Sequence, residues 1–182
     1  DIGRADIVIA TMLFMEEHFL PVLPALQARR NDCDAMVCAM SAGEVMKLTR
    51  MGKFDMAAPA SGPMALLKRL RGKPAADGHS ESGVKASAGA QQMKMLRRIP
   101  QMLRFIPGTA QDVRAYFLTL QYWLGGSDEN MLNLVRHVVD RGAEGPRRVL
   151  RGLFKAAAPV EYPEVGVYHP RLPSRLGSDA AA

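Results

Sequence analysis

The sequence lacks the features of a membrane protein or a small secreted domain. Its 182 residues contain no run of about 18 uncharged apolar residues, which excludes a membrane-spanning helix. Its two cysteines, Cys33 and Cys38, are too few for a disulfide framework, so we expect reduced thiols. The chain opens on Asp1 and shows no signal peptide. We therefore expect a cytoplasmic protein, with Asp1 an internal position of a longer one.

The common motifs of nucleotide binding and catalysis are also missing. There is no G-x-x-x-x-G-K-[ST] and no G-x-G-x-x-G, so no nucleotide site is visible. There is no G-x-S-x-G, so no nucleophile elbow is predicted. Cys33 and Cys38 have no second Cys or His pair at zinc-ligand spacing. No motif therefore predicts a catalytic or metal-binding residue in this chain.

Charge is present but unevenly spread. The net charge is +6, while residues 56–111 alone hold nine Lys or Arg against two acids. This basic segment has three interpretations: a solvated helix face beside a flexible loop, an anion-binding surface for a carboxylated ligand or acidic partner, or a nucleic-acid surface. Nucleic acid is disfavoured, because Phe105 is the only aromatic residue between Met56 and Ala115.

The first third of the chain predicts a βαβ unit. Residues 6–12 and 34–40 are apolar runs without alternation, typical of strands buried on both faces of a parallel sheet. Residues 14–30 between them predict a helix that Pro21 and Pro24 kink or delay. A Ser41-x-x-Glu44 capping box then predicts a helix to about residue 50, stopped by glycine 52.

The remainder predicts a loop, then helices, then one more strand. Residues 72–90 are small and polar without apolar period, which indicates a mobile loop. Apolar spacings of three and four predict helices over 93–106, over 109–124 with a Thr109-x-x-Asp112 cap, and from Ser127 onward. Short glycine-rich links favour antiparallel packing. A further short helix is expected over 147–154, and Glu164–Tyr168 is expected to return as a third strand to the first sheet.

The fold class predicted is α/β. We expect a short parallel βαβ sheet, half of a flavodoxin- or Rossmann-like sheet, with an appended antiparallel helical segment. The expected divisions are a βαβα part (1–56), a basic helix and mobile loop (57–90), a helical part (91–158), the returning strand (159–172) and a tail (173–182).

Among the four histidines, His169 is the best functional candidate. It follows the predicted third strand, and ligands bind at strand ends in parallel sheets. His18, His79 and His137 are expected at exposed positions. Gly125-Gly126-Ser127 precedes a helix N-terminus that suits an anion, but an ordinary helix–helix turn is the preferred interpretation.

Four stretches, taken together, resemble a known family. They are ATMLFMEE (10–17), GEVMKLTRMGKF (43–54), AQDVRAYFLTLQYWLGGSDEN (110–130) and GVYHP (166–170). They resemble the N-terminal region of the large, porphyrin-binding (H-type) subunit of magnesium chelatase, which is related to the large cobaltochelatase subunit. The third stretch is the most specific, and the resemblance extends over nearly the whole chain.

The resemblance implies a piece of an enzyme that inserts Mg²⁺ into protoporphyrin IX in (bacterio)chlorophyll biosynthesis. Its expected partners are the rest of the large subunit, the AAA+ ATPase subunits that hydrolyse ATP, the adaptor subunits, and the porphyrin. No metal-insertion residue of the family falls on a position here, so the fragment is expected to be non-catalytic and free of cofactors. Candidate porphyrin contacts are His169, Trp123, Arg97 and Arg98. The alternatives are a cobaltochelatase-like large subunit and a stand-alone tetrapyrrole- or partner-binding module.

Overall fold

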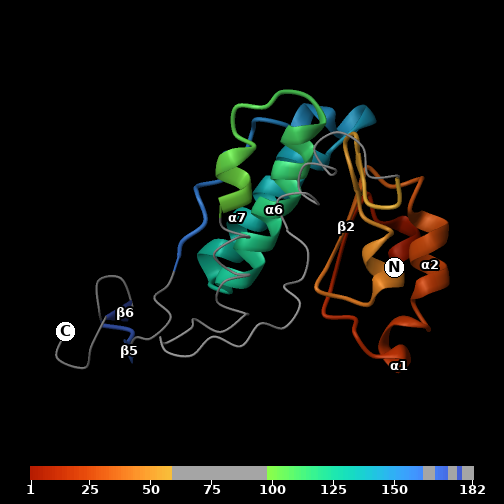
Figure 1. Cartoon of the computed structure of the whole chain (residues 1–182), viewed down its shortest axis with the longest axis horizontal. Helices are drawn as coiled ribbons and strands as arrows, with labels where there is room; N and C mark the ends of the chain where they lie inside the picture. Colours follow the sequence, from red (N-terminus) through yellow and green to blue (C-terminus); the bar gives the residue numbers. More distant parts are fainter. Residues whose placement is uncertain (59–97, 162–166, 172–175, 178–182) are drawn as a thin grey trace, which may run out of the picture.

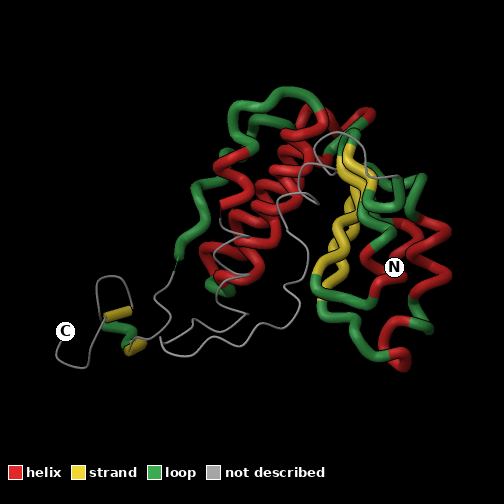
Figure 2. The backbone as a smooth tube through the Cα atoms, viewed as in Figure 1, coloured by secondary structure: helices red, strands yellow, loops and turns green. Residues whose placement is uncertain are grey.

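The computed structural model describes residues 1–58, 98–161, 167–171 and 176–177, and these form an α/β fold. A four-stranded sheet of order β1-β2-β3-β4 lies between two helical layers (Figures 1 and 2). The elements are η1 (Ile2–Arg4), β1 (Ile7–Thr11), α1 (Glu16–Phe19), α2 (Leu23–Arg29), β2 (Ala35–Ala39), α3 (Gly43–Met46), β3 (Arg50–Met51), β4 (Phe54–Asp55), α6 (Thr109–Gly125), α7 (Asp128–Gly142), η2 (Gly145–Leu150), β5 (Val167–Tyr168) and β6 (Leu176–Gly177). The predicted fold class is confirmed.

The predicted βαβ unit is present, but the predicted burial of one of its strands is wrong. β1 and β2 pair in parallel from Ile7↔Ala35 to Thr11↔Ala39, and the helix between them breaks around Pro21 as expected. β2 is buried at all five positions. β1 is an edge strand in which Ile9 is 37% exposed, so the prediction that it is buried on both faces is wrong. Its run of β-branched residues reflects strand propensity.

After β2 the chain forms a hairpin where the sequence predicted a longer helix. α3 ends at Met46, and β3 and β4 then add antiparallel strands beside β2. The Ser41 hydroxyl does not cap α3, because it accepts a bond from the Leu13 N–H (3.1 Å) and donates to the Ala39 carbonyl (3.0 Å). Gly52 has φ +56° in the hairpin turn, a conformation that favours glycine, and is not a helix stop.

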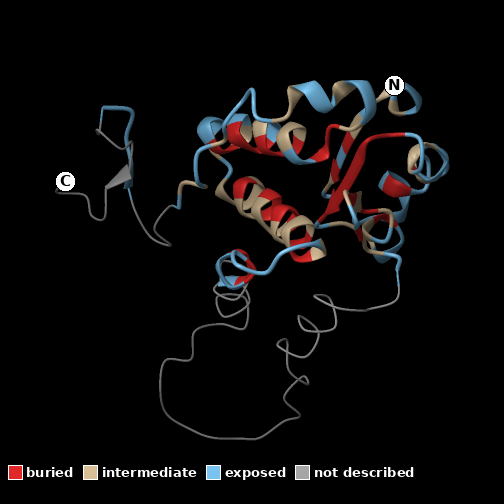
Figure 3. Ribbon diagram, turned by 90° about the horizontal axis from the view of Figure 1, so that it is seen from above, coloured by how far each residue is buried: buried red, intermediate tan, exposed pale blue. Residues whose placement is uncertain are grey.

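Each face of the sheet carries its own hydrophobic cluster, because side chains alternate along a strand. Ala35, Val37 and Ala39 of β2 face α6 and α7, while Met36 and Cys38 face α1, α2 and α3. Figure 3 shows the buried residues along the strands and on the helix sides turned toward them. On the α6 side the rings of Phe54 and Tyr116 lie 5.3 Å apart, and the Tyr116 hydroxyl donates to the Cys38 carbonyl (3.3 Å).

α6 and α7 lie side by side and confirm the helices predicted over 109–124 and from Ser127 (Figure 1). The Ser127 hydroxyl accepts a bond from the Asn130 N–H (3.2 Å), as an N-cap should. The predicted Thr109 cap is wrong: Gly108 is the N-cap, without a side-chain bond. Asp112 instead accepts a bond from the Lys53 N–H (2.9 Å) and so joins α6 to the hairpin. The Gly126 turn (φ +63°) is an ordinary helix–helix link.

Two buried asparagines of α7 direct the chain after η2. Asn130 accepts from the Val160 N–H (2.9 Å) and donates to the Val160 carbonyl (3.0 Å). Asn133 accepts from the Ala157 N–H (3.0 Å). These bonds hold residues 157–160 against the helices. They also give hydrogen-bond partners to backbone N–H and carbonyl groups that would otherwise lack them.

The segment expected to return to the first sheet does not do so among the described residues. β5 pairs antiparallel with β6 in a separate small sheet, which stands apart from the helices and the main sheet in Figure 1. The short helix expected over 147–154 is a 3₁₀ helix over residues 145–150, so it begins earlier and ends sooner than expected. Apart from residues 57–58, the predicted basic helix and mobile loop lie outside the described residues. Of the helix predicted over 93–106, residues 93–97 also lie outside them, 98–102 are helical and 103–105 form a turn. The predicted domain divisions stay predictions.

Candidate functional site at the carboxyl ends of the parallel strands

The structure does not bring the predicted site residues together. His169 follows β5 in the small separate sheet, is exposed, and its Nδ1 accepts from the Arg171 N–H (3.2 Å). Trp123 lies in α6, partly buried against the core. Arg98 is exposed at the start of the helical residues 98–102, and Arg97 lies outside the described residues. His169 is therefore not at the end of a parallel strand, and these four residues stay predictions as porphyrin contacts.

The prediction that His137 lies at the surface is wrong. It is 6% exposed, and its Nε2 lies 3.0 Å from the Ala115 carbonyl between α6 and α7. Burial lowers the pKa of its imidazole, because the charged form is poorly solvated there. Its role in the described structure is to join two helices.

The carboxyl ends of β1 and β2 form a tightly connected edge. The Met12 N–H donates to the Met40 carbonyl (3.0 Å), and the Ala42 N–H donates to the Leu13 carbonyl (2.8 Å). The Ser41 hydroxyl adds its bond from the Leu13 N–H. These bonds hold the loop after β1 beside the loop after β2. In open α/β sheets this edge is where ligands bind.

Both loops contain a strained residue. Met12 has φ +63° and Met40 has φ +45°, a left-handed region that side chains other than glycine rarely occupy. Such conformations persist only where surrounding contacts fix them, and they cluster at functional sites. Here the two strained residues share the Met12–Met40 backbone bond described above.

Large apolar side chains are exposed along this edge. Met12 and Phe14 are each 51% exposed and Met15 is 54% exposed. Met40, in the loop after β2, is 36% exposed. We call Met12, Phe14, Met15 and Met40 the apolar edge. Contiguous exposed apolar surface marks interaction sites, whereas scattered single residues do not.

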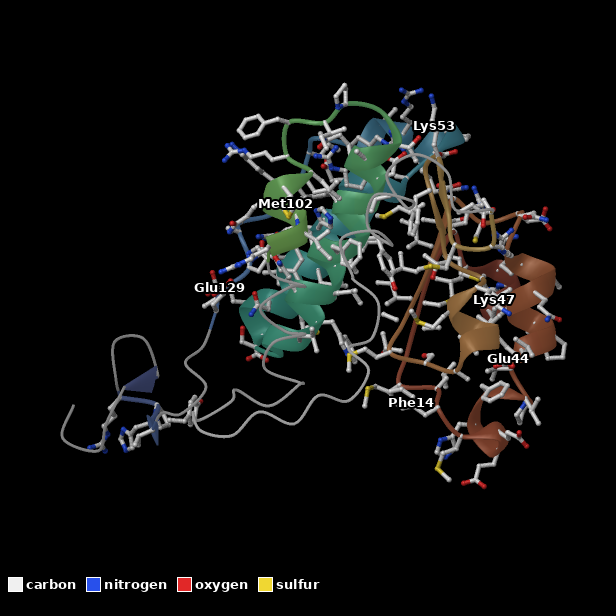
Figure 4. The ribbon with its side chains drawn as sticks, in the orientation of Figure 1. Phe14, Glu44, Lys47, Lys53, Met102 and Glu129 are labelled. Carbon is white, nitrogen blue, oxygen red and sulfur yellow. The ribbon has the colours of Figure 1, made fainter. Side chains whose placement is uncertain are left out.

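Three exposed carboxylates border the apolar edge: Glu16 and Glu17 in α1, and Glu44 in α3. We call them the acidic rim. Figure 4 shows Glu44 between Phe14 and Lys47, with Lys47 farther from the edge. His18 lies beside Glu17, with its Nε2 3.9 Å from Oε1. Of the three carboxylates, only Glu17 takes part in an ion pair between described residues.

The side chains of the apolar edge hold no ionisable group. Thioether, phenyl and alkyl groups bind by contact area and dispersion, and methionine adapts to irregular partners. Across the described ranges, no three of His, Cys, Asp or Glu lie close enough to hold a metal ion. No described helix is long and apolar enough to cross a membrane. What this edge offers chemically is a contact surface.

Sequence reasoning missed the apolar edge although a signal was available. The rule that placed His169 at a strand end applies equally to residues 12–15 and 40–42, which follow the two well-predicted strands. Phe14 was assigned to a helix face, because residues 14–30 were interpreted as one helix. The structure begins α1 only at Glu16 and leaves Phe14 in the loop.

Comparisons with known proteins give one family and several relatives. The family described as "Domain of unknown function (DUF3479)" matches residues 1–117. The H subunit of magnesium chelatase from Cereibacter sphaeroides is 54% identical over 178 residues, 98% of this chain and 14% of the relative. The corresponding H subunit from Rhodobacter capsulatus is 52% identical over 97% of this chain and 14% of its own length. The chloroplastic ChlH subunit of magnesium chelatase from Oryza sativa subsp. indica is 30% identical over 96% of this chain. The chain thus spans about one seventh of the two bacterial relatives.

Proposed function

The chain belongs to the DUF3479 family, and from its homology to the N-terminal region of the magnesium-chelatase H subunit we propose that it serves as the N-terminal domain of a magnesium chelatase large subunit. The observation that carries this proposal is 54% identity over 98% of the chain. It agrees with the resemblance predicted from four stretches of sequence. On this proposal the complete enzyme inserts Mg²⁺ into protoporphyrin IX in (bacterio)chlorophyll biosynthesis, with ATP hydrolysed on AAA+ partner subunits.

Within that enzyme we propose a binding role and no chemical step for this domain. The support is the nature of its candidate site, where Met12, Phe14 and Met15 are exposed side chains without acid or base groups and without the oxygen ligands that Mg²⁺ takes. Metal insertion then falls to residues elsewhere in the large subunit. The domain contributes a preorganised surface at the carboxyl ends of β1 and β2.

Reconstitution of chelatase activity tests the proposal. Three proteins are compared: the intact large subunit, the subunit lacking residues 1–182, and residues 1–182 alone. Each is mixed with ATPase and adaptor subunits, Mg²⁺, ATP and protoporphyrin, and product is followed by Mg-protoporphyrin fluorescence. We expect product from the intact subunit, little from the truncated one, and none from residues 1–182. Adding residues 1–182 to the truncated subunit should restore product.

Two results would contradict the proposal in different ways. Product formed by residues 1–182 without the rest of the subunit would show that the domain itself carries the chemistry. An unchanged rate after removal of residues 1–182 would show that the domain has no part in the enzyme. Supplying Co²⁺ in place of Mg²⁺, with product followed by porphyrin absorbance because cobalt quenches the fluorescence, tests the cobaltochelatase alternative.

The basic segment supports a second candidate role, direct porphyrin binding. Its excess of Lys and Arg suits the two propionates of protoporphyrin, which are ionised near neutral pH. Arg98 is exposed and belongs to this segment. Trp123 is the only tryptophan, so its fluorescence reports binding in a protoporphyrin titration of residues 1–182. Quenching that Arg98→Glu weakens, with a Soret shift, would support this role, and no quenching would exclude it.

A further inference from the structure

We propose that the apolar edge is a docking surface inside the large subunit, covered by an apolar protein surface that Lys and Arg border. The covering surface belongs to the rest of the same polypeptide, so this inference rests on the proposed function. It concerns the four residues Met12, Phe14, Met15 and Met40, to which neither the family description nor the names of the relatives assign a role.

The first argument is contiguity. Met12, Phe14 and Met15 lie within four consecutive positions, and each has about half of its surface exposed. The backbone bond from Met12 to Met40 brings the second loop alongside. A soluble surface tolerates single exposed apolar residues, but a contiguous set is costly in water unless a partner covers it.

The second argument is preorganisation. Met12 and Met40 are held in left-handed backbone conformations by the bonds between their loops. A surface that is already fixed loses little conformational entropy when a partner docks, which favours binding. Strain at two facing loop residues is better explained by a shaped contact surface than by packing, because their side chains are exposed.

The third argument is charge, and it selects the occupant. Glu16, Glu17 and Glu44 border the edge. A protoporphyrin has the right flat apolar surface, but its two propionates would meet these carboxylates and be repelled. A protein surface bordered by Lys and Arg would instead be complementary to the acidic rim. The charge pattern therefore favours protein over porphyrin at this edge.

The fourth argument is the length of the relatives. This chain covers 14% of the magnesium-chelatase H subunit from Cereibacter sphaeroides. On the proposed function, most of the polypeptide lies outside the described structure and is available to cover the edge. Because domain and cover belong to one polypeptide, their effective concentration is high, and a small interface suffices.

Methionine oxidation in the intact, porphyrin-free large subunit tests the proposal without a mutation. The subunit is treated with dilute peroxide, and each methionine is quantified by mass spectrometry against an added exposed peptide. Met36 is fully buried and gives the protected limit within the same protein. We expect Met12 and Met15 to oxidise at least about tenfold more slowly than the peptide. Rates equal to that of the peptide would overturn the proposal.

Two further results would overturn the proposal by naming another occupant. Protection that appears only when protoporphyrin is added would assign the edge to the porphyrin. Protection that fades when the subunit is diluted would assign it to a second copy. Since this readout does not use chelatase activity, its failure leaves the proposed function standing. A failure of the reconstitution assay, with Met12 and Met15 still protected, would overturn the proposed function and leave the covered edge standing.

Matched variants of the intact subunit separate docking from folding. Phe14→Asp should raise oxidation of Met12 and Met15, while Leu132→Asp on α7, also 51% exposed in the described structure, should not. Glu44→Lys should also raise the oxidation of Met12 and Met15. Glu129→Lys should not, although both glutamates lie in the first turn of a helix. Met36 must stay protected in every variant. Equal effects within each pair would overturn the proposal.

Discussion

One buried carboxylate fixes the path of the chain after α7. Asp34, 8% exposed, accepts two hydrogen bonds from the Arg147 guanidinium and one from the Glu144 N–H, each 2.8 Å long. The bonds from Arg147 hold the pKa of Asp34 below its ordinary value. A carboxyl with a lowered pKa in the folded state stabilises the fold at neutral pH, and this stabilisation is lost as the pH falls through that pKa.

Asp34→Asn should therefore destabilise the protein in a pH-dependent way. We expect a loss of about 2 kcal/mol in the free energy of unfolding at pH 7, because the charge-assisted bonds are weakened. The gap from wild type should begin to shrink as the pH falls below about 4, where the carboxyl of the unfolded chain takes up a proton, and should close as the pH falls through the lowered pKa of the folded state. Urea unfolding of both proteins across that pH range measures the difference in their free energy of unfolding. Asp32→Asn, at an exposed neighbouring residue, serves as the control. A loss of stability in Asp34→Asn that stays the same as the pH falls would contradict the argument.

Single residues were predicted well where one local rule decided their role. Ser127 caps α7 because its hydroxyl meets an unpaired N–H three residues on, which sequence spacing alone specifies. Asp112 and His137 differ because their partners come from elsewhere in the chain: the Lys53 N–H and the Ala115 carbonyl. A side chain's partner 22 or more residues away is invisible to spacing.

At the scale of elements, α7 packs so closely on the sheet that replacing one of its glycines by alanine should destabilise the protein. A Cβ at Gly142 would lie 2.8 Å from the Ala35 Cβ, whereas one at Gly43 of α3 would meet nothing within 4 Å. Gly→Ala in a helix normally stabilises by up to about 1 kcal/mol. Gly43→Ala should show that gain. Gly142→Ala should instead lower the melting temperature, since overpacking costs about 1–3 kcal/mol. A melting temperature of Gly142→Ala at or above that of Gly43→Ala would contradict the packing.

Elements were predictable in proportion to their length and periodicity. α6 and α7 repeat their apolar stripes over several turns, and β1 and β2 are five-residue apolar runs. β3 and β4 have two residues each, too few for any period. Just before β3, the buried Thr49 hydroxyl accepts a bond from the Cys38 N–H and donates one to the Cys38 carbonyl, which holds the start of the hairpin beside β2.

For the whole molecule, the candidate site depended on strand pairing that spacing does not specify. His169 was placed at the site because its strand was assigned to the first sheet, and the structure pairs that strand with β6 instead. The apolar edge lies where β1 and β2 both end, so its position could be predicted from those two strands. Its acidic rim, in contrast, depends on how α1 and α3 begin after their loops.

The βα part and the helical part should unfold as one unit. One cluster joins sheet and helices, and Phe54, Tyr116 and Val138 are each almost fully buried in it. Two polar links cross the same boundary, Lys53 to Asp112 and Arg147 to Asp34. Removing either part would expose the apolar face of the other, so neither is expected to fold alone. Urea unfolding followed by Trp123 fluorescence, which reports α6, should coincide with unfolding followed by circular dichroism. Two separated transitions, or a cooperatively folded piece of residues 1–58 alone, would show that the halves are independent.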